Sequence, residues 1–123
     1  MGLRVLITNN TLAWRAGSEL YVRDVALALT ARGHEAIAFS LFLGEVAAEL
    51  REAGIAVVDD LRLLDRPLDL IHGQHHVETS MASLRFPKVP VLYFCHGVIP
   101  WEEMPPKLPL VARLRINTPS SRK

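Results

Sequence analysis

Two apolar segments of this chain each end in a histidine followed by a glycine. Residues 69–71 run into His72 and Gly73, and residues 91–95 run into His96 and Gly97. In a parallel α/β sheet, the carboxyl ends of neighbouring strands open onto one crevice. A neutral imidazole can accept one proton and donate another near physiological pH, so two of them suit hydroxyl binding or proton transfer. We therefore predict a ligand site at the ends of these segments if they form neighbouring strands.

Alternating strand and helix signals run through residues 3–95. Short apolar runs predict five strands, at residues 3–8, 35–40, 55–58, 69–72 and 91–95. Helical spacing and caps predict helices that begin at Ser18, Glu45 and Thr79, and the first two are predicted to stop at Gly33 and Gly54. This alternation predicts an α/β fold, a Rossmann-like doubly wound parallel sheet with helices on both faces.

Right-handed crossovers restrict the order of these strands. We predict the Rossmann-like order 3-2-1-4-5, in which the first and fourth strands flank the point where the strand order reverses. Asn10, in the turn after the first strand, would then line one cleft with His72 and His96. In the alternative flavodoxin-like order 2-1-3-4-5, the two histidines would remain neighbours but would lie away from this turn.

Composition limits the class of protein. At 123 residues, half of them hydrophobic, the chain has the size and apolar content of one domain with a real core. Its single cysteine, Cys95, cannot form an internal disulfide, which favours a reducing compartment. The sequence begins without a signal-peptide pattern, and no apolar run approaches the roughly 20 residues that a membrane span requires. We expect a cytoplasmic protein.

The net charge of +1 is unevenly distributed. Five of the 14 basic residues follow Pro105, where there is no acid, so nine basic residues face all 13 acidic ones before it. We predict a domain over residues 1–100 and a proline-rich, basic tail over 101–123 that continues the domain incompletely. Nothing in this pattern indicates a nucleic-acid partner. The apolar and basic residues of 104–116 have two interpretations: peripheral contact with the inner face of a membrane, or a surface loop with a short helix from Pro109.

The segment that opens the first helix could bind an anion. A glycine at position 17 lets a ligand approach the backbone, and free N–H groups at a helix N-terminus attract negative charge. Gly17 and Ser18 are therefore candidate phosphate contacts. The alternative is a glycine that only permits the turn. The sequence has no Gly-x-Gly-x-x-Gly and no P-loop motif, which disfavours ordinary dinucleotide and P-loop sites.

The histidines and the cysteine also suggest a metal site. His72, His75, His76, Cys95 and His96 would supply enough zinc ligands. However, adjacent residues of a strand point to opposite faces, so Cys95 and His96 could not share one ion. We expect no metal, solvated loop positions for His75 and His76, and a buried apolar role for Cys95.

Three segments together resemble glycosyltransferase family 4, a group of GT-B sugar transferases. Ala-Gly-Ser-Glu at 16–19, with Arg-Gly-His-Glu at 32–35, is similar to the family's Gly-Gly-x-Glu loop and the helix that follows it. Residues 69–75 resemble its Asp-x-x-His-x-His stretch, and residues 90–97 resemble its strand that ends in His-Gly. The resemblance covers about residues 3–100. It departs at position 16, where the family often has a second glycine.

This resemblance implies the N-terminal, acceptor-side domain of a nucleotide-sugar-dependent glycosyltransferase that retains configuration and needs no metal or other cofactor. By position, His96 would be the catalytic residue, a hydrogen-bonding or polarising group beside the transferred sugar. The backbone of Gly17 would approach the donor diphosphate or the reacting centre. His72 would shape the same wall of the site, where Ser18, Asn10 and Gly97 are further binding candidates. The partners implied are a nucleotide sugar and a small-molecule acceptor.

The resemblance also implies that the chain stops early. No donor domain follows the fifth strand, so we expect a truncated GT-B domain with little or no transferase activity alone, because both walls of the cleft must hold the reactants. The strand at 91–95 would lie at or near an open sheet edge, which favours self-association. Two other function classes remain open: a non-catalytic Rossmann-like module for nucleotide binding or assembly, and a small metal-dependent hydrolase.

Overall fold

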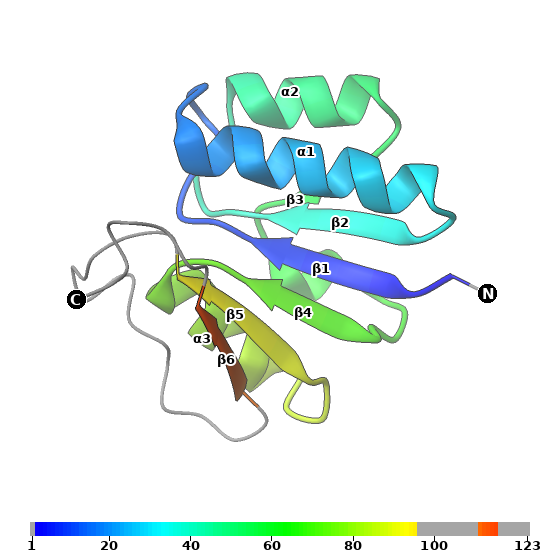
Figure 1. The fold of residues 1–123 in the computed structure, drawn as a ribbon, viewed down its shortest axis with the longest axis vertical. Coiled ribbons are helices and arrows are strands. Elements are labelled where there is room, and N and C mark those ends of the chain that lie inside the picture. The colour runs from blue at the N-terminus through cyan, green and yellow to red at the C-terminus, as the bar shows by residue number, and fades with distance from the viewer. Residues whose placement is uncertain (1, 96–110, 116–123) are drawn as a thin grey trace.

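The computed structural model describes residues 2–95 and 111–115 and contains one parallel sheet in the order β3-β2-β1-β4-β5-β6 (Figure 1). Its strands are β1 (Arg4–Thr8), β2 (Glu35–Phe39), β3 (Ala56–Val58), β4 (Leu70–Gly73), β5 (Val91–Cys95) and β6 (Val111–Arg115). The first five follow the predicted order 3-2-1-4-5. The fold is therefore α/β and Rossmann-like, with the reversal of strand order between β1 and β4.

The sixth strand was not predicted. β6 pairs in parallel with β5 over its whole length, from Val91 opposite Val111 to Cys95 opposite Arg115. The expectation that the chain stops with the fifth strand is therefore wrong. The fifth strand was predicted at or near an open edge, and it lies next to the edge strand β6. The alternative of a short helix from Pro109 does not hold for residues 111–115, which are a strand. The outer edge of β5 carries backbone N–H and C=O groups that must be satisfied, and a five-residue strand satisfies them although prolines precede it in the sequence.

Two helices cover one face of the sheet. α1 (Gly17–Ala31) and α2 (Glu45–Glu52) lie over β1, β2 and β3 (Figure 1). Their contacts with the sheet form a core cluster that includes Val22 of α1, Val46 of α2 and Ile7 of β1. The opposite cluster joins α3 (His76–Arg85) and the 3-10 helix η1 (Leu61–Leu63) to the other face, where Leu6 lies.

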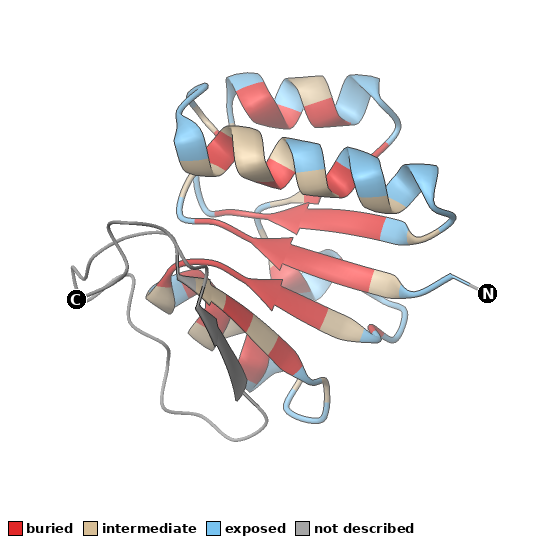
Figure 2. Ribbon diagram, viewed as in Figure 1, coloured by how far each residue is buried: buried red, intermediate tan, exposed pale blue. Residues whose placement is uncertain are grey.

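The apolar runs of the strands reflect this two-sided burial. Successive residues of β1 alternate between the two clusters, so all of positions 5–8 are buried (Figure 2). Because helices lie on both faces, a strand of this kind needs apolar residues at consecutive positions rather than at every second one.

The helix ends were predicted with mixed success. Gly33 and Gly54 have φ of 87° and 83°, a conformation that glycine adopts without cost, and they follow α1 and α2 as expected. The start of α1 is at Gly17, with Ala16 rather than Ser18 in the cap position and no side-chain cap hydrogen bond. The prediction that Ser18 caps this helix is therefore wrong, because Ser18 is the second residue of the helix and its hydroxyl contacts the side chain of Asn9.

α3 begins at His76, three residues earlier than predicted. The extra turn forms because hydrogen bonds join Thr8, at the end of β1, to Gln74 and Thr79. Among the residues that the structure describes, no helix has both the length and the apolar character to cross a membrane.

Candidate functional site

β4 and β5 are neighbours, as the two histidine-tipped segments predicted. His72 lies opposite Leu92 in the parallel register, and Gly73 lies opposite Tyr93. His96 and Gly97 follow β5 and lie outside the described residues. The juxtaposition of the two imidazoles, and the catalytic role of His96, therefore remain predictions.

His72 takes part in an aromatic cluster. Its ring stacks on Phe94 with a centroid distance of 4.0 Å and an interplanar angle of 7°, and Tyr21 of α1 lies 6.0 Å from it. His72 itself is 7 % exposed, and burial raises the pKa of the Tyr21 phenol. His72 therefore packs between the sheet and α1. It does not line the large cleft of the molecule.

A cleft of about 860 Å³ opens at the carboxyl end of the sheet. Three connections form it: the loop after β1, the loop after β2 and the first turn of α3. Its lining residues are Asn10, Thr11, Ala13, Trp14, Leu41, Phe42, Leu43, His75, Val77 and Glu78. The cleft lies next to the reversal between β1 and β4, the place where sheets of this topology bind ligands. Asn10 lines it, but His72, which was predicted to share one cleft with Asn10, does not.

His75 lines this cleft, and its own backbone is in a strained conformation. It is the cap residue of α3, with φ 66° and ψ 147°, and within the described part of the chain it is the one non-glycine residue with positive φ. Its Nδ1 accepts a hydrogen bond from the backbone N–H of Asn10 at 3.3 Å, so a neutral ring carries its proton on Nε2. Its side chain is buried, and His76 is half-buried at the start of α3. The expectation of solvated loop positions is wrong for both: the loop after β1 contacts His75, and His76 is the first residue of α3.

Glu78 was missed by the sequence analysis. This carboxyl lies in the first turn of α3, is 5 % exposed and lines the cleft. Burial raises its pKa above the ordinary value, although its own backbone N–H and the charge of His75 act in the opposite direction. The available signal was its spacing: a glutamate three residues after a cap position is favoured by the helix N-terminus.

Hydrogen bonds fix the first turn of α3 to the sheet. The hydroxyl of Thr8, at the end of β1, accepts from the backbone N–H of Gln74 at 3.0 Å and lies 3.1 Å from the hydroxyl of Thr79. Gly73 allows this approach, because a Cβ there would lie 2.6 Å from the side chain of Thr79. The chain therefore enters α3 along one tightly packed path, which positions His75 and Glu78.

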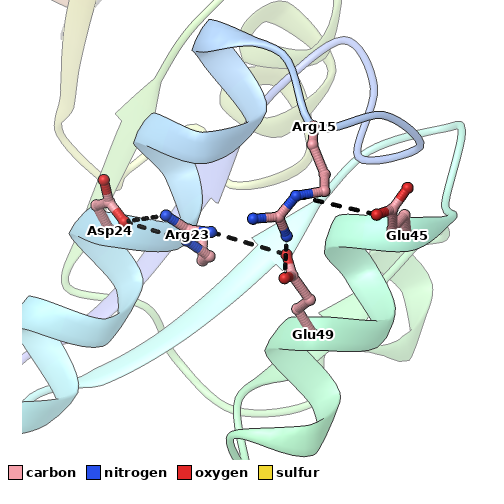
Figure 3. Close-up of polar contacts among 5 residues, drawn as sticks. All are labelled: Arg15, Arg23, Asp24, Glu45 and Glu49. Carbon is pink, nitrogen blue, oxygen red and sulfur yellow. Dashed lines mark hydrogen bonds and ion pairs between the residues drawn. The ribbon is translucent and has the colours of Figure 1, made fainter.

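The loop after β1 is held equally firmly on its other side. Arg15 pairs with Glu49 and, at 3.9 Å, with Glu45, both on α2 (Figure 3). The backbone N–H of Leu12 donates to Phe42 in the loop after β2 at 2.8 Å. Each ion pair alone contributes little, but the pairs tie the loop after β1 to α2, and the backbone bond joins this loop to the loop after β2.

Gly17 and Ser18 lie beside this cleft rather than among its lining residues. A Cβ at Gly17 would meet nothing within 4 Å, and its φ is not in the left-handed region. Neither packing nor backbone conformation therefore requires glycine at position 17. The alternative, that this glycine only permits the turn, loses its structural support. Ser18 Oγ lies 3.4 Å from the side-chain nitrogen of Asn9.

Within residues 2–95 and 111–115, no three histidine, cysteine, aspartate or glutamate side chains lie where they could share a metal ion. The lining of the described cleft combines a buried carboxyl, an imidazole and apolar side chains. No protein-family model and no curated protein matches this sequence.

Proposed function

We propose that this chain is the acceptor-side, N-terminal part of a glycosyltransferase that takes its sugar from a nucleotide-sugar donor. The observation that supports this most directly is the cleft beside the reversal between β1 and β4, which contains His75 and Glu78. Sugar transfer requires a site that holds an acceptor hydroxyl and takes up its proton, and a carboxylate and an imidazole are suited to both tasks.

In this proposal the acceptor occupies the cleft with its reacting hydroxyl toward His75 and Glu78. The exposed backbone N–H groups at the start of α1, at Gly17 and Ser18, face the donor diphosphate, which the partial positive charge of a helix N-terminus attracts. His96 has the role that its position after β5 suggests, a hydrogen bond to the transferred sugar. Transfer proceeds with retention and without a metal ion.

A non-catalytic module that binds a nucleotide is the second candidate. The open space around Gly17 favours it as much as it favours the transferase, because a nucleotide phosphate alone could occupy the N-terminus of α1. The two functions differ in the cleft: only the transferase needs a second, phosphate-free ligand there.

Amide chemical-shift mapping separates the two functions. The 15N-labelled chain is titrated with nucleotide sugars and, separately, with neutral sugar acceptors. The transferase requires that donors shift the amides of Gly17 and Ser18 and that acceptors shift those of Asn10 and Glu78. Shifts with nucleotides alone would favour the non-catalytic module. Shifts confined to residues far from both sites, such as Leu63, would overturn both functions.

A further inference from the structure

The residues that line the cleft fall into an apolar group and a polar group. Six of its residues are apolar: Ala13, Trp14, Leu41, Phe42, Leu43 and Val77. The other four are Asn10, Thr11, His75 and Glu78, and two of these carry a titratable group. Neither lysine nor arginine, the permanently charged side chains that bind anionic head groups, lines the described cleft.

Apolar side chains are exposed at this cleft to an unusual degree. Trp14 is 70 % exposed and Phe42 is 65 % exposed, and Leu41 and Val77 are also among the exposed large hydrophobics. The remaining four of the eight described residues in this class, Leu3, Leu27, Leu63 and Leu84, lie outside the cleft. Single exposed hydrophobics need no explanation, but a group that surrounds a concave site indicates the ligand that covers it.

Backbone hydrogen bonds join the two loops that carry these side chains. The loops that hold Trp14 and Phe42 are joined by the bond from Leu12 N–H to Phe42 and by an isolated bridge between Leu12 and Leu43. The N–H of Glu45 also donates to Ala13 at 3.0 Å. A site of fixed shape loses little conformational entropy when it binds, so its apolar area is available to stabilise a ligand.

The polar residues lie where they can hold one small group. Glu78 is buried in the first turn of α3, and His75 is fixed by the hydrogen bond from Asn10. A hydroxyl can donate to a carboxylate and accept from an N–H, so it satisfies both kinds of partner. A ligand with many hydroxyls and no apolar part would leave several of them unpaired against the apolar walls, which is costly.

We propose that the cleft binds an uncharged alcohol with an apolar body, which lies against Trp14 and Phe42 and directs a hydroxyl toward His75 and Glu78. The assignment of this alcohol as a sugar acceptor rests on the function proposed above; its binding does not. The volume of about 860 Å³ lies within the range of small-molecule sites, which favours a compact ligand over a protein segment.

Two glucosides that differ only in their apolar part test this proposal. Octyl β-glucoside, used below its micelle concentration, and methyl β-glucoside are titrated into the full chain by isothermal calorimetry. We expect the octyl compound to bind at least about tenfold more tightly, since each buried methylene adds to the affinity. Phe42→Ala should weaken octyl glucoside about tenfold, equivalent to about 1.4 kcal/mol, and change methyl glucoside little.

Leu63→Ala is the matched control, because Leu63 is 64 % exposed, like Phe42, but lies in η1 outside the cleft. It should change neither affinity. Glu78→Gln keeps the shape of the side chain and should weaken both glucosides, because both present hydroxyls.

The outcomes separate this inference from the proposed function. Equal affinity for the two glucosides, or equal effects of Phe42→Ala and Leu63→Ala, would overturn the proposal that the ligand has an apolar body. Either result would be compatible with a sugar acceptor. A clear preference for the octyl compound, together with no response to nucleotide sugars at Gly17, would support the alcohol site and count against the transferase.

Discussion

The strained backbone of His75 predicts that the glycine variant is more stable than the alanine variant at this position, the reverse of the order expected within a helix. At φ 66° and ψ 147°, this residue lies close to a region that glycine alone commonly visits. We compare two substitutions, His75→Gly and His75→Ala. Both remove the imidazole and its hydrogen bond with Asn10, which by itself contributes about 0.5–1.5 kcal/mol. The difference between the two variants therefore isolates the cost of a Cβ at this backbone conformation.

The expected difference follows from two opposing effects. Relief of the strain favours the glycine variant by about 1–3 kcal/mol. The greater freedom of glycine in the unfolded chain offsets about 0.4–1 kcal/mol of this. We therefore expect His75→Gly to be more stable than His75→Ala by about 1–2 kcal/mol, measured by urea unfolding with equal m-values. Both variants should lose affinity for ligands of the cleft.

Ala28 is the matched control position. It is exposed within α1, where the backbone is helical, so Ala28→Gly should destabilise the chain by about 1 kcal/mol. The two sites should thus rank alanine and glycine in opposite order. If His75→Ala is as stable as His75→Gly, the backbone at position 75 is not strained.

Three further predictions concern a buried acid, an exposed ion pair and a close approach. Burial raises the pKa of Glu78 above 4.5 in the folded chain, so its protonated form stabilises the fold. This stabilisation is complete below pH 4.5 and is lost as the pH rises through the pKa of the folded chain. Glu78→Gln should remove this decline of the free energy of unfolding, measured by urea unfolding. Hydrogen bonds from Arg62 lower the pKa of Asp60 to about 2, so Arg62→Gln should raise it toward 3.8 in an NMR titration of the carboxyl carbon. Gly73→Ala should destabilise the chain by about 1–3 kcal/mol, since the new Cβ would lie 2.6 Å from Thr79.

Each of these has its own check. A stability profile of Glu78→Gln that runs parallel to the original between pH 4 and pH 7 would contradict the raised pKa. The Arg62→Gln shift should be incomplete, because the backbone N–H of residue 62 still donates to Asp60 at 2.9 Å; a full return to 3.8 would show that this bond contributes nothing. Gly17→Ala, with no atom within 4 Å of the new Cβ, is the control for Gly73→Ala and should not destabilise the chain.

Local patterns in the sequence were enough to predict five of the six described strands, the order of those five and the ends of two helices. The continuous apolar runs at 5–7 and 36–39 are typical of strands with helices on both faces, and right-handed crossovers then leave few strand orders. Gly33 and Gly54 were recognisable because a left-handed φ after a helix is a local requirement that one residue type meets best. The turn at Asn10 could be placed beside β4 for the same reason, once the strand order was known.

The residues that form the cleft come together only in the folded chain. Trp14, Phe42 and Glu78 come from three connections that are far apart in the sequence, and no spacing pattern relates them. His75 reads as a solvated loop residue until the loop after β1 is seen to cover it. Burial of a loop side chain depends on what packs against it from elsewhere, and pairing at a sheet edge, as in β6, depends on which backbone groups another strand leaves unsatisfied. Both are properties of the assembled molecule, so local sequence does not encode them.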